Sequence, residues 1–323
     1  MSAEDRLIAR HFAPVASHAG ALGLTDDAAV LTPPPGCDLV LTTDALVAGV
    51  HFFADDLPDM VARKALRLNL SDLAAKGAAP LGFLLSLALA KETGEEWLGR
   101  FAQGLRADAE AYACPLFGGD SVRTPGPVTI SIAMLGSVPR GSMVRRAGAE
   151  AGDRIFVSGS IGDATLGLAL RSGTKWNISR AEREHLSSRY LLPQPRNALA
   201  EAVRGNASAA MDVSDGLVGD LAKLVRVSGV SAVVEAAKVP LSDAAKAVLA
   251  ADPPAVEMVL TGGDDYEIIC TVPPAKVSAF RNAAKAANVP VTDIGEIVAG
   301  EGTNFIAAGG QAMTFKHAAF SHF

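Results

Sequence analysis

The sequence predicts a two-domain α+β protein, on three observations. Its 323 residues exceed the size of most single hydrophobic cores, so two domains are expected. Residues 128–138 alternate apolar and polar side chains, which is typical of a half-buried strand. After Gly152 strand-like and helix-like segments alternate, which is typical of an α/β domain. We therefore expect an N-terminal domain with a mixed sheet and helices over residues 1–140 and a C-terminal α/β domain over residues 141–323.

Apolar periodicity places the elements of the first half. Segments with apolar residues at helical spacing cover 5–13, 58–76 and 95–113, and strand-like segments cover 28–31, 38–43, 81–88 and 128–138. Pro139 and Gly141 then break the pattern, so we expect the domain boundary there.

The second half begins with a strand at 154–158, a Gly-Ser-Ile-Gly turn at 159–162 and a helix at 163–171. Residues 173–195 form a polar excursion with one expected helix. Further helices are expected at 196–205, 217–227, 242–250 and 274–288, and strands at 232–235, 266–272 and 293–298.

Composition excludes several classes of protein. A net charge of −6 and a pI near 5.6 argue against nucleic acid or an anionic membrane as a partner, since both need a basic surface. The most apolar stretch, 81–90, is far shorter than the roughly 20 residues of a membrane span. The N-terminus carries acids and no long apolar segment, so we expect no targeting peptide. Three dispersed cysteines without a CxxC pattern predict no disulfide framework and a reducing, cytoplasmic location.

Acidic residues recur where apolar segments end, which points to a metal–phosphate site. Hard divalent cations prefer carboxylate and hydroxyl oxygens. Two carboxylates about 4 Å apart repel by roughly 4 kcal/mol at an effective dielectric near 20, so converging acids need a cation, protons or wide spacing. The positions concerned are Asp26-Asp27, Asp44, Asp72, Asp120, Asp212, Asp215 and Asp264-Asp265.

Asp72 stands out because of its place on a helix. Val61, Ala65 and Leu68 form an apolar stripe that continues onto Asp72, so its carboxylate is aimed toward the core side. It is either a structural acid satisfied by backbone N–H groups or a metal ligand. We favour the ligand.

Most of the other motifs also have an ordinary structural interpretation. Thr42-Thr43-Asp44 alone reads as a turn or helix cap, and Ser214 is placed to be an N-cap of the helix from Leu217. Three oxygen-bearing side chains in Asp212-Val213-Ser214-Asp215 exceed what a cap needs, and a helix N-terminus favours phosphate. The turn at 159–162 lacks the Lys-Ser/Thr of a P-loop, so its phosphate signal is weak.

Taken together, the motifs resemble those of the thiamine-monophosphate kinase family, within the ATP-binding superfamily of aminoimidazole ribonucleotide synthetase and selenophosphate synthetase. The matching segments follow family order along nearly the whole chain: Asp26-Asp27-Ala28-Ala29-Val30, 42–52, 69–78, Gly118-Gly119-Asp120-Ser121, Arg146-Ala147-Gly148-Ala149, 212–217 and 262–267.

The resemblance implies phosphorylation of thiamine monophosphate to thiamine diphosphate by in-line attack on ATP, with several Mg²⁺ ions and a homodimer formed by the N-terminal domains. It implies Mg²⁺ binding by Asp27, Thr42, Thr43, Asp44, Asp72, Asp120, Asp212 and Asp215, of which Asp44, Asp72, Asp120 and Asp212 are the catalytic candidates. It implies ATP contacts from Gly119, Asp120, Arg146 and Ser214, and substrate contacts from His51 and Asp264. The second half would complete a cleft whose metal ligands come mostly from the first.

The sequence departs from the family pattern at three places. Leu24-Thr25 replaces the usual Ile-Gly, and Asp264 replaces the usual Glu, which shortens its reach by one methylene. The family's C-terminal, substrate-packing Trp has no counterpart, and Phe315 or Phe320 is the candidate replacement.

Two other functions compete with this interpretation. One is another ATP-using reaction of the same superfamily, making an aminoimidazole ribonucleotide or selenophosphate; the second of these is weakened because no cysteine precedes Cys37. The other is a noncatalytic module that binds divalent metal, which predicts Mg²⁺ binding without ATP turnover.

Overall fold

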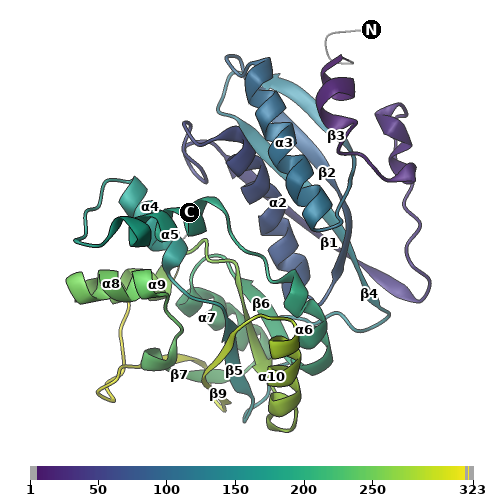
Figure 1. The fold of residues 1–323 in the computed structure, drawn as a ribbon. Helices are drawn as coiled ribbons and strands as arrows, with labels where there is room; N and C mark the ends of the chain where they lie inside the picture. Colours follow the sequence, from purple (N-terminus) through teal and green to yellow (C-terminus); the bar gives the residue numbers. More distant parts are fainter. Residues whose placement is uncertain (1–5, 317–318, 320–323) are drawn as a thin grey trace. The chain divides into compact units, whose positions relative to one another are not determined.

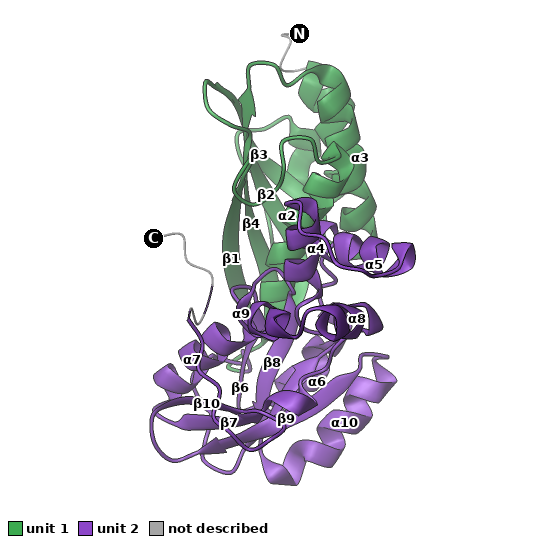
Figure 2. Ribbon diagram, turned by 90° about the vertical axis from the view of Figure 1, so that its left-hand side faces the viewer, with its two compact units in different colours: residues 1–73, 78–141 green, residues 74–77, 142–323 purple. Residues whose placement is uncertain are grey.

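The chain folds into two compact units, seen in the computed structural model of Figures 1 and 2. The structure describes residues 6–316 and 319. The first unit spans residues 1–73 and 78–141, and the second spans 74–77 and 142–323.

The first unit is built on a four-stranded mixed sheet. The strand order is β1-β4-β2-β3, with β2 and β3 parallel and the other neighbours antiparallel. The mixed sheet with helices expected for the N-terminal half is therefore present. Its elements are η1 (Ile8–Phe12), η2 (Ala19–Leu24), β1 (Cys37–Val47), α2 (Pro58–Ala75), β2 (Ala79–Ala90), α3 (Glu95–Ala111), β3 (Leu116–Thr124) and β4 (Thr129–Pro139).

Helices α2 and α3 cover one face of this sheet (Figures 1 and 2). The side chains of β4 alternate between the two faces of the sheet. Ile130, Ile132 and Met134 are buried beneath the helices, while the residues between them are partly exposed on the other face. The opposite face carries apolar side chains without such cover, and Leu41 is 71% exposed there. Burial of one face thus fixes the register, because a one-residue slip would exchange the two faces.

The second unit contains a six-stranded, mostly antiparallel sheet. The order is β10-β7-β9-β5-β8-β6, and only β10 and β7 pair in parallel. Its strands are β5 (Arg154–Ser158), β6 (Ala209–Val213), β7 (Ser231–Glu235), β8 (Glu267–Val272), β9 (Val291–Val298) and β10 (Gly302–Ile306). Its helices are α4 (Asp163–Arg171), α5 (Arg180–Leu191), α6 (Ala200–Asn206), α7 (Leu217–Ser228), α8 (Asp243–Ala251), α9 (Val256–Thr261) and α10 (Val277–Ala286), with short 3₁₀ turns η3 (Asn197–Leu199), η4 (Ala236–Lys238), η5 (Pro253–Ala255) and η6 (Pro274–Lys276).

Alternate residues of the central strands pack into two separate hydrophobic cores, one on each face of the sheet. In β5, Ile155 and Val157 pack with α7 on one face, while Phe156 packs with α6 and α10 on the other. Both faces of the sheet are therefore covered by helices (Figure 2). This explains why β5 and β8 carry continuous apolar runs.

The excursion at 173–195 is a packed part of the second unit. Helix α5 and Trp176 join α4, α8 and α9 in a third apolar cluster, and Trp176 Nε1 donates to Asp252 Oδ2 at 2.9 Å. The segment expected to be a polar excursion is therefore part of a core that it shares with α4, α8 and α9.

Most of the expected helices and strands are present. One expected strand is absent, and three strands and one α-helix of the structure were not expected. The strand expected at 28–31 is wrong, because those residues form a loop. Strands β3, β6 and β10 and helix α9 were not expected, since they are short or carry Gly and Asp that hide the apolar period. Within the described residues, no helix is both long and apolar enough to span a bilayer.

Burial predicts which cysteines react. Burial raises the pKa of the Cys114 thiol and of the Cys270 thiol to about 12, whereas Cys37 is half-buried at the start of β1. Because the thiolate is the nucleophile, we expect Ellman's reagent to modify Cys37 alone in the native protein near pH 8, and all three thiols in guanidinium. Rapid native labelling of a Cys37→Ser variant would contradict this assignment.

Candidate functional site

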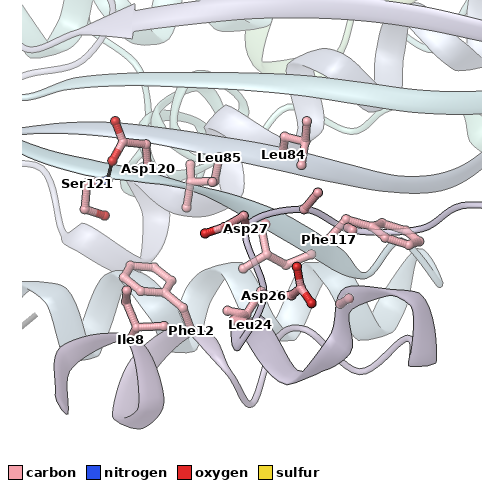
Figure 3. Close-up of a pocket in the computed structure, with 16 residues that line it drawn as sticks. Ile8, Phe12, Leu24, Asp26, Asp27, Leu84, Leu85, Phe117, Asp120 and Ser121 are labelled. Carbon is pink, nitrogen blue, oxygen red and sulfur yellow. Dashed lines mark hydrogen bonds between the residues drawn. The ribbon is translucent and has the colours of Figure 1, made fainter. Parts of the chain in front are cut away.

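A cavity of about 540 Å³ lies in the first unit between strand β3 and the N-terminal segment (Figure 3). Its walls combine apolar rings with carboxylates, which suits a ligand with one apolar part and one charged part. The lining residues used below are Phe12, Asp26, Asp27, Phe117, Gly119 and Asp120.

Gly119 is required by the close pairing of β3 with β2. A Cβ at this position would lie 1.8 Å from the carbonyl oxygen of Leu85, so any side chain would push the strands apart. Asp120 and Ser121 then point to opposite sides of β3 (Figure 3), and Asp120 Oδ1 accepts a hydrogen bond from the backbone N–H of Ser121 at 2.8 Å. The Asp120 side chain is exposed at the cavity.

Asp26 and Asp27 follow a tightly wound turn. Leu22, Gly23 and Leu24 all have positive φ, at 52°, 65° and 56°. For the two leucines this conformation costs on the order of 1 kcal/mol or more each, so the surrounding contacts must hold the turn. Leu24, one of the departures from the family pattern, sits in this strained turn and lines the cavity.

Strand β1 directs the side chains of its consecutive residues Thr42 and Thr43 to opposite faces of the sheet. Thr42 Oγ1 donates a hydrogen bond to Asp72 Oδ2 of α2, and Asp44 lies on the same face of β1 as Thr42. Thr43 lies on the opposite, open face, where its register neighbour is Ala133. The hydroxyl of Thr43 therefore does not join Thr42, Asp44 and Asp72.

His51 lies in the turn that follows β1 and is held by the backbone. Its Nδ1 accepts from the N–H of Val47 at 3.0 Å, and its carbonyl accepts from Lys64 Nζ at 3.2 Å. Because Nδ1 is an acceptor, the ring proton of the neutral imidazole is on Nε2. The ring orientation is thus fixed by structure that the sequence pattern did not reveal.

In the second unit, the loop after β6 is shaped by Asp220. This carboxylate is fully buried in the first turn of α7, and its Oδ2 accepts from the N–H groups of Ser214 at 3.0 Å and Asp215 at 2.9 Å. The expectation that Ser214 caps α7 is wrong, because the N-cap is Gly216 and makes no side-chain bond. Burial raises the pKa of Asp220, and the ammonium of Lys223 opposes that rise.

The loop 262–266 lies directly against the Ser214 loop. The N–H of Asp264 donates to the Ser214 carbonyl at 2.8 Å, and that of Tyr266 donates to the Val213 carbonyl at 2.9 Å. Asp264 has φ +73° and Tyr266 has φ +51°, conformations that persist only where contacts hold them. The structure therefore brings together Ser214 and Asp264, two candidate ligand-binding residues 50 positions apart in sequence.

Gly263 makes this approach possible. A Cβ at Gly263 would lie 2.3 Å from the Ser214 carbonyl oxygen, and one at Gly262 would lie 2.2 Å from Thr165 Oγ1. Gly263 thus lets the loop 262–266 pack against the Ser214 loop, and Gly262 lets the same loop pack against α4.

The next acidic residue, Asp265, points into the protein. Its fully buried carboxylate accepts from the N–H of Gly162 at 2.7 Å and of Ala164 at 3.2 Å, so it occupies the N-terminus of α4. Burial raises the pKa of Asp265 well above its usual value, although both backbone bonds oppose the rise. The turn at 159–162 is therefore closed by a side chain, which argues against its use as a phosphate cradle.

Glu267 anchors the segment 262–267 through a second set of hydrogen bonds. It is fully buried, accepts from Arg196 Nε at 2.6 Å and from Arg189 Nη2 at 2.9 Å, and accepts from Ser158 Oγ at 2.6 Å. None of these partners was predicted from the sequence. Arg196 was expected only as the first residue of the helix at 196–205, with no role in binding an acid.

The remaining candidates lie in simpler surroundings. Asp212 is a buried residue of β6, and Arg146 is exposed in a segment whose carbonyl oxygen accepts from Ser228 Oγ at 3.5 Å. Phe315 packs edge-on against Phe305, with ring centroids 5.5 Å apart, and belongs to the core of the second unit. Phe320, the other candidate aromatic, lies outside the described residues.

The donors suit a hard divalent cation, but no tight acidic cluster is formed. Among the described residues, no three His, Cys, Asp or Glu side chains gather closely enough to hold a metal ion. The candidates are carboxylate and hydroxyl oxygens, and Mg²⁺ is usually held by one or two protein carboxylates, with phosphate and water completing its shell. The side chains therefore fit Mg²⁺ that arrives with a phosphate ligand.

Two family matches cover most of the chain. Residues 25–138 match the family described as AIR synthase related protein, N-terminal domain, and residues 150–307 match the corresponding C-terminal domain. The curated thiamine-monophosphate kinase of Caulobacter vibrioides is 47% identical over 88% of this chain and 80% of its own length. That of Salmonella typhimurium is 40% identical over 99% and 98%.

This chain belongs to the thiamine-monophosphate kinase family. A crystal structure of the family from Stenotrophomonas maltophilia has a TM-score of 0.84, at 38% identity and 96% coverage of both chains. A structure described as AaThiL complexed with AMPPCP and TMP has a TM-score of 0.79 at 32% identity, over 92% of this chain and 91% of that one. The two-domain α+β fold expected from the sequence is thus confirmed within this family.

The family loop 262–267 depends on Asp265 as a structural anchor. Asp265→Ala leaves the N–H groups of Gly162 and Ala164 buried without a partner, so we expect a loss of about 3 kcal/mol in the free energy of unfolding. Urea denaturation measures it, with Glu184→Gln in an exposed pair as the control that changes less than about 0.5 kcal/mol. A loss as small as the control's would show that Asp265 is not an anchor.

Proposed function

We propose that this chain transfers the γ-phosphoryl group of ATP to thiamine monophosphate, giving thiamine diphosphate and ADP in the cytoplasm. The observation that carries this is the relative solved with AMPPCP, an ATP analogue, and TMP, which aligns over 92% of this chain. The family's motifs occur in order across that aligned length.

Charge neutralisation is the main chemical task in this reaction. Two anionic phosphate groups must approach in line, and the protein has a net charge of −6, so bound Mg²⁺ rather than a basic cleft would supply the positive charge. The proposed Mg²⁺ ligands are Asp27, Thr42, Thr43, Asp44, Asp72, Asp120, Asp212 and Asp215. When bound, the metal offsets charge on the transferred group and aligns it.

The protein's own groups hold the substrates and need not abstract a proton. The attacking oxygen belongs to a phosphate monoester whose second pKa is about 6, so it is already anionic near pH 7. Ser214, with Gly119, Asp120 and Arg146, is proposed to contact ATP, and His51 and Asp264 to contact the substrate. Asp264 is suited to the positively charged thiazolium ring, and its loop is held against Ser214.

Asp72 tests the metal role most directly. Asp72→Asn keeps an acceptor for Thr42 but removes the charge, so we expect kcat to fall at least about 100-fold with unfolding stability changed by less than about 1 kcal/mol. Coupled ADP release and chromatographic detection of thiamine diphosphate measure the rate. Asp59→Asn, the same change elsewhere on α2 in a residue paired with Arg100, is the control and should stay active.

The wild-type assay also decides between the competing functions. Thiamine diphosphate formation supports the proposal. ATP consumption only with an aminoimidazole precursor or selenide would favour the rival reactions, and Mg²⁺ binding without any turnover would favour the noncatalytic module.

The open sheet face of the first unit supports the proposed homodimer. Leu41, Leu84 and Val122 are 71%, 43% and 50% exposed and lie on one face of the sheet. Monomers rarely expose a contiguous apolar patch of this kind, and a sheet face can pair with its own copy about a two-fold axis. Thr43 and Asp120 share this face, which offers a reason for their separation from Thr42 and Asp44.

Leu41→Glu is expected to weaken the dimer at least about 100-fold, because it would bury a charge in the proposed interface at its most exposed apolar residue. Analytical ultracentrifugation of the full chain measures the dissociation constant. Leu168→Glu, at an exposed leucine of α4, should leave it unchanged. A wild-type chain that is monomeric at micromolar concentration, or a variant that dimerises normally, would count against this interface.

A further inference from the structure

The ammonium group of Lys223 lies between two carboxylates beside the Ser214 loop. Its Nζ donates to Asp220 Oδ1 at 2.8 Å and also to Asp215 Oδ2. Asp220 is fully buried, whereas the side chains of Lys223 and Asp215 are 31% and 37% exposed. The cation therefore links an immobile carboxylate to one that solvent reaches.

Asp220 keeps this cation in place. Its second oxygen accepts from the backbone N–H groups of Ser214 and Asp215, so the carboxylate is fixed by the loop itself. The side chain of a lysine is ordinarily charged at neutral pH, and here the ammonium of Lys223 has a carboxylate partner on each side.

We infer that Lys223 is a resident counter-cation of Asp215, which a divalent cation must displace before Asp215 can serve as a metal ligand. The inference rests on the proposed function, which makes Asp215 a Mg²⁺ ligand. A carboxylate oxygen that already holds an ammonium binds a second cation more weakly, because the two positive charges repel at close range. Lys223 is thus a positioning residue: it holds the Asp215 carboxylate next to Asp220 without metal and lowers the affinity of Asp215 for free Mg²⁺.

Lys223→Met removes the charge while keeping an unbranched side chain. In EDTA, Asp215 and Asp220 then repel without a cation between them, so we expect the melting temperature to fall by about 3 °C or more. Adding Mg²⁺ should restore most of that loss. Mn²⁺, titrated by electron paramagnetic resonance in the absence of nucleotide, should bind about fivefold or more tightly than to wild type.

The chain provides a matched control for the loss of a lysine. Lys246 pairs with Asp243 at the same i, i+3 spacing on α8, with an Nζ to Oδ1 distance of 3.1 Å. Lys246→Met should leave both the Mn²⁺ affinity and the response to Mg²⁺ unchanged. The double variant Lys223→Met with Asp215→Asn should lose the gain in affinity and the rescue by Mg²⁺, since both depend on the Asp215 carboxylate.

The outcomes separate this inference from the proposed function. An active wild type whose Lys223→Met variant binds Mn²⁺ no more tightly, or is not stabilised by Mg²⁺, overturns the counter-cation alone and leaves a structural lysine. An inactive wild type overturns the kinase assignment, whatever the Mn²⁺ affinity. If Lys223→Met does not fold even in Mg²⁺, Lys223→Gln takes its place, because it removes the charge and keeps a donor; the same two results are expected.

Discussion

Buried carboxylates that accept backbone N–H groups determine the shape of the loops in the second unit. Asp220 holds the loop at Ser214, and Asp265 holds the turn before α4. A buried carboxylate costs several kcal/mol unless its oxygens are bonded, so each loop has few alternatives to the conformation that supplies those bonds. The partly exposed neighbours Ser214 and Asp264 are consequently held on a rigid base, as their proposed binding role requires.

The segment 264–267 shows how one motif serves two purposes. Asp264 remains partly exposed, whereas Asp265 and Glu267 are buried and take hydrogen bonds from α4, α5 and the Arg196 segment. A substitution at any of these acids would damage the protein, but through different causes. Of these three acids Asp264 alone has a partly exposed side chain, so sensitivity to mutation alone would not distinguish the proposed binding residue from the two anchors.

Elements with a regular apolar period could be predicted from the sequence, whereas contacts that depend on how distant segments pack could not. The stripe leading to Asp72 and the alternation of β4 gave the correct helix face and strand. Strand β3 was missed because Gly118, Gly119 and Asp120 interrupt its apolar pattern, although Gly119 is there to let β3 approach β2. Asp220 was not among the residues singled out in the sequence, and only the folded chain shows that it accepts the N–H groups of Ser214 and Asp215.

The placement of the acidic side chains bears on the stage at which the proposed metal ion would bind. Within the described residues, neither unit gathers three acids at one point, and the acids that lie close together have partners of their own, Thr42 for Asp72 and Lys223 for Asp215 and Asp220. This arrangement avoids the repulsion that converging carboxylates would suffer in the absence of metal. The proposed Mg²⁺ would then depend on phosphate oxygens to complete its coordination. Its tight binding would coincide with the proposed nucleotide binding, which would deliver the cation where the transferred charge has to be stabilised.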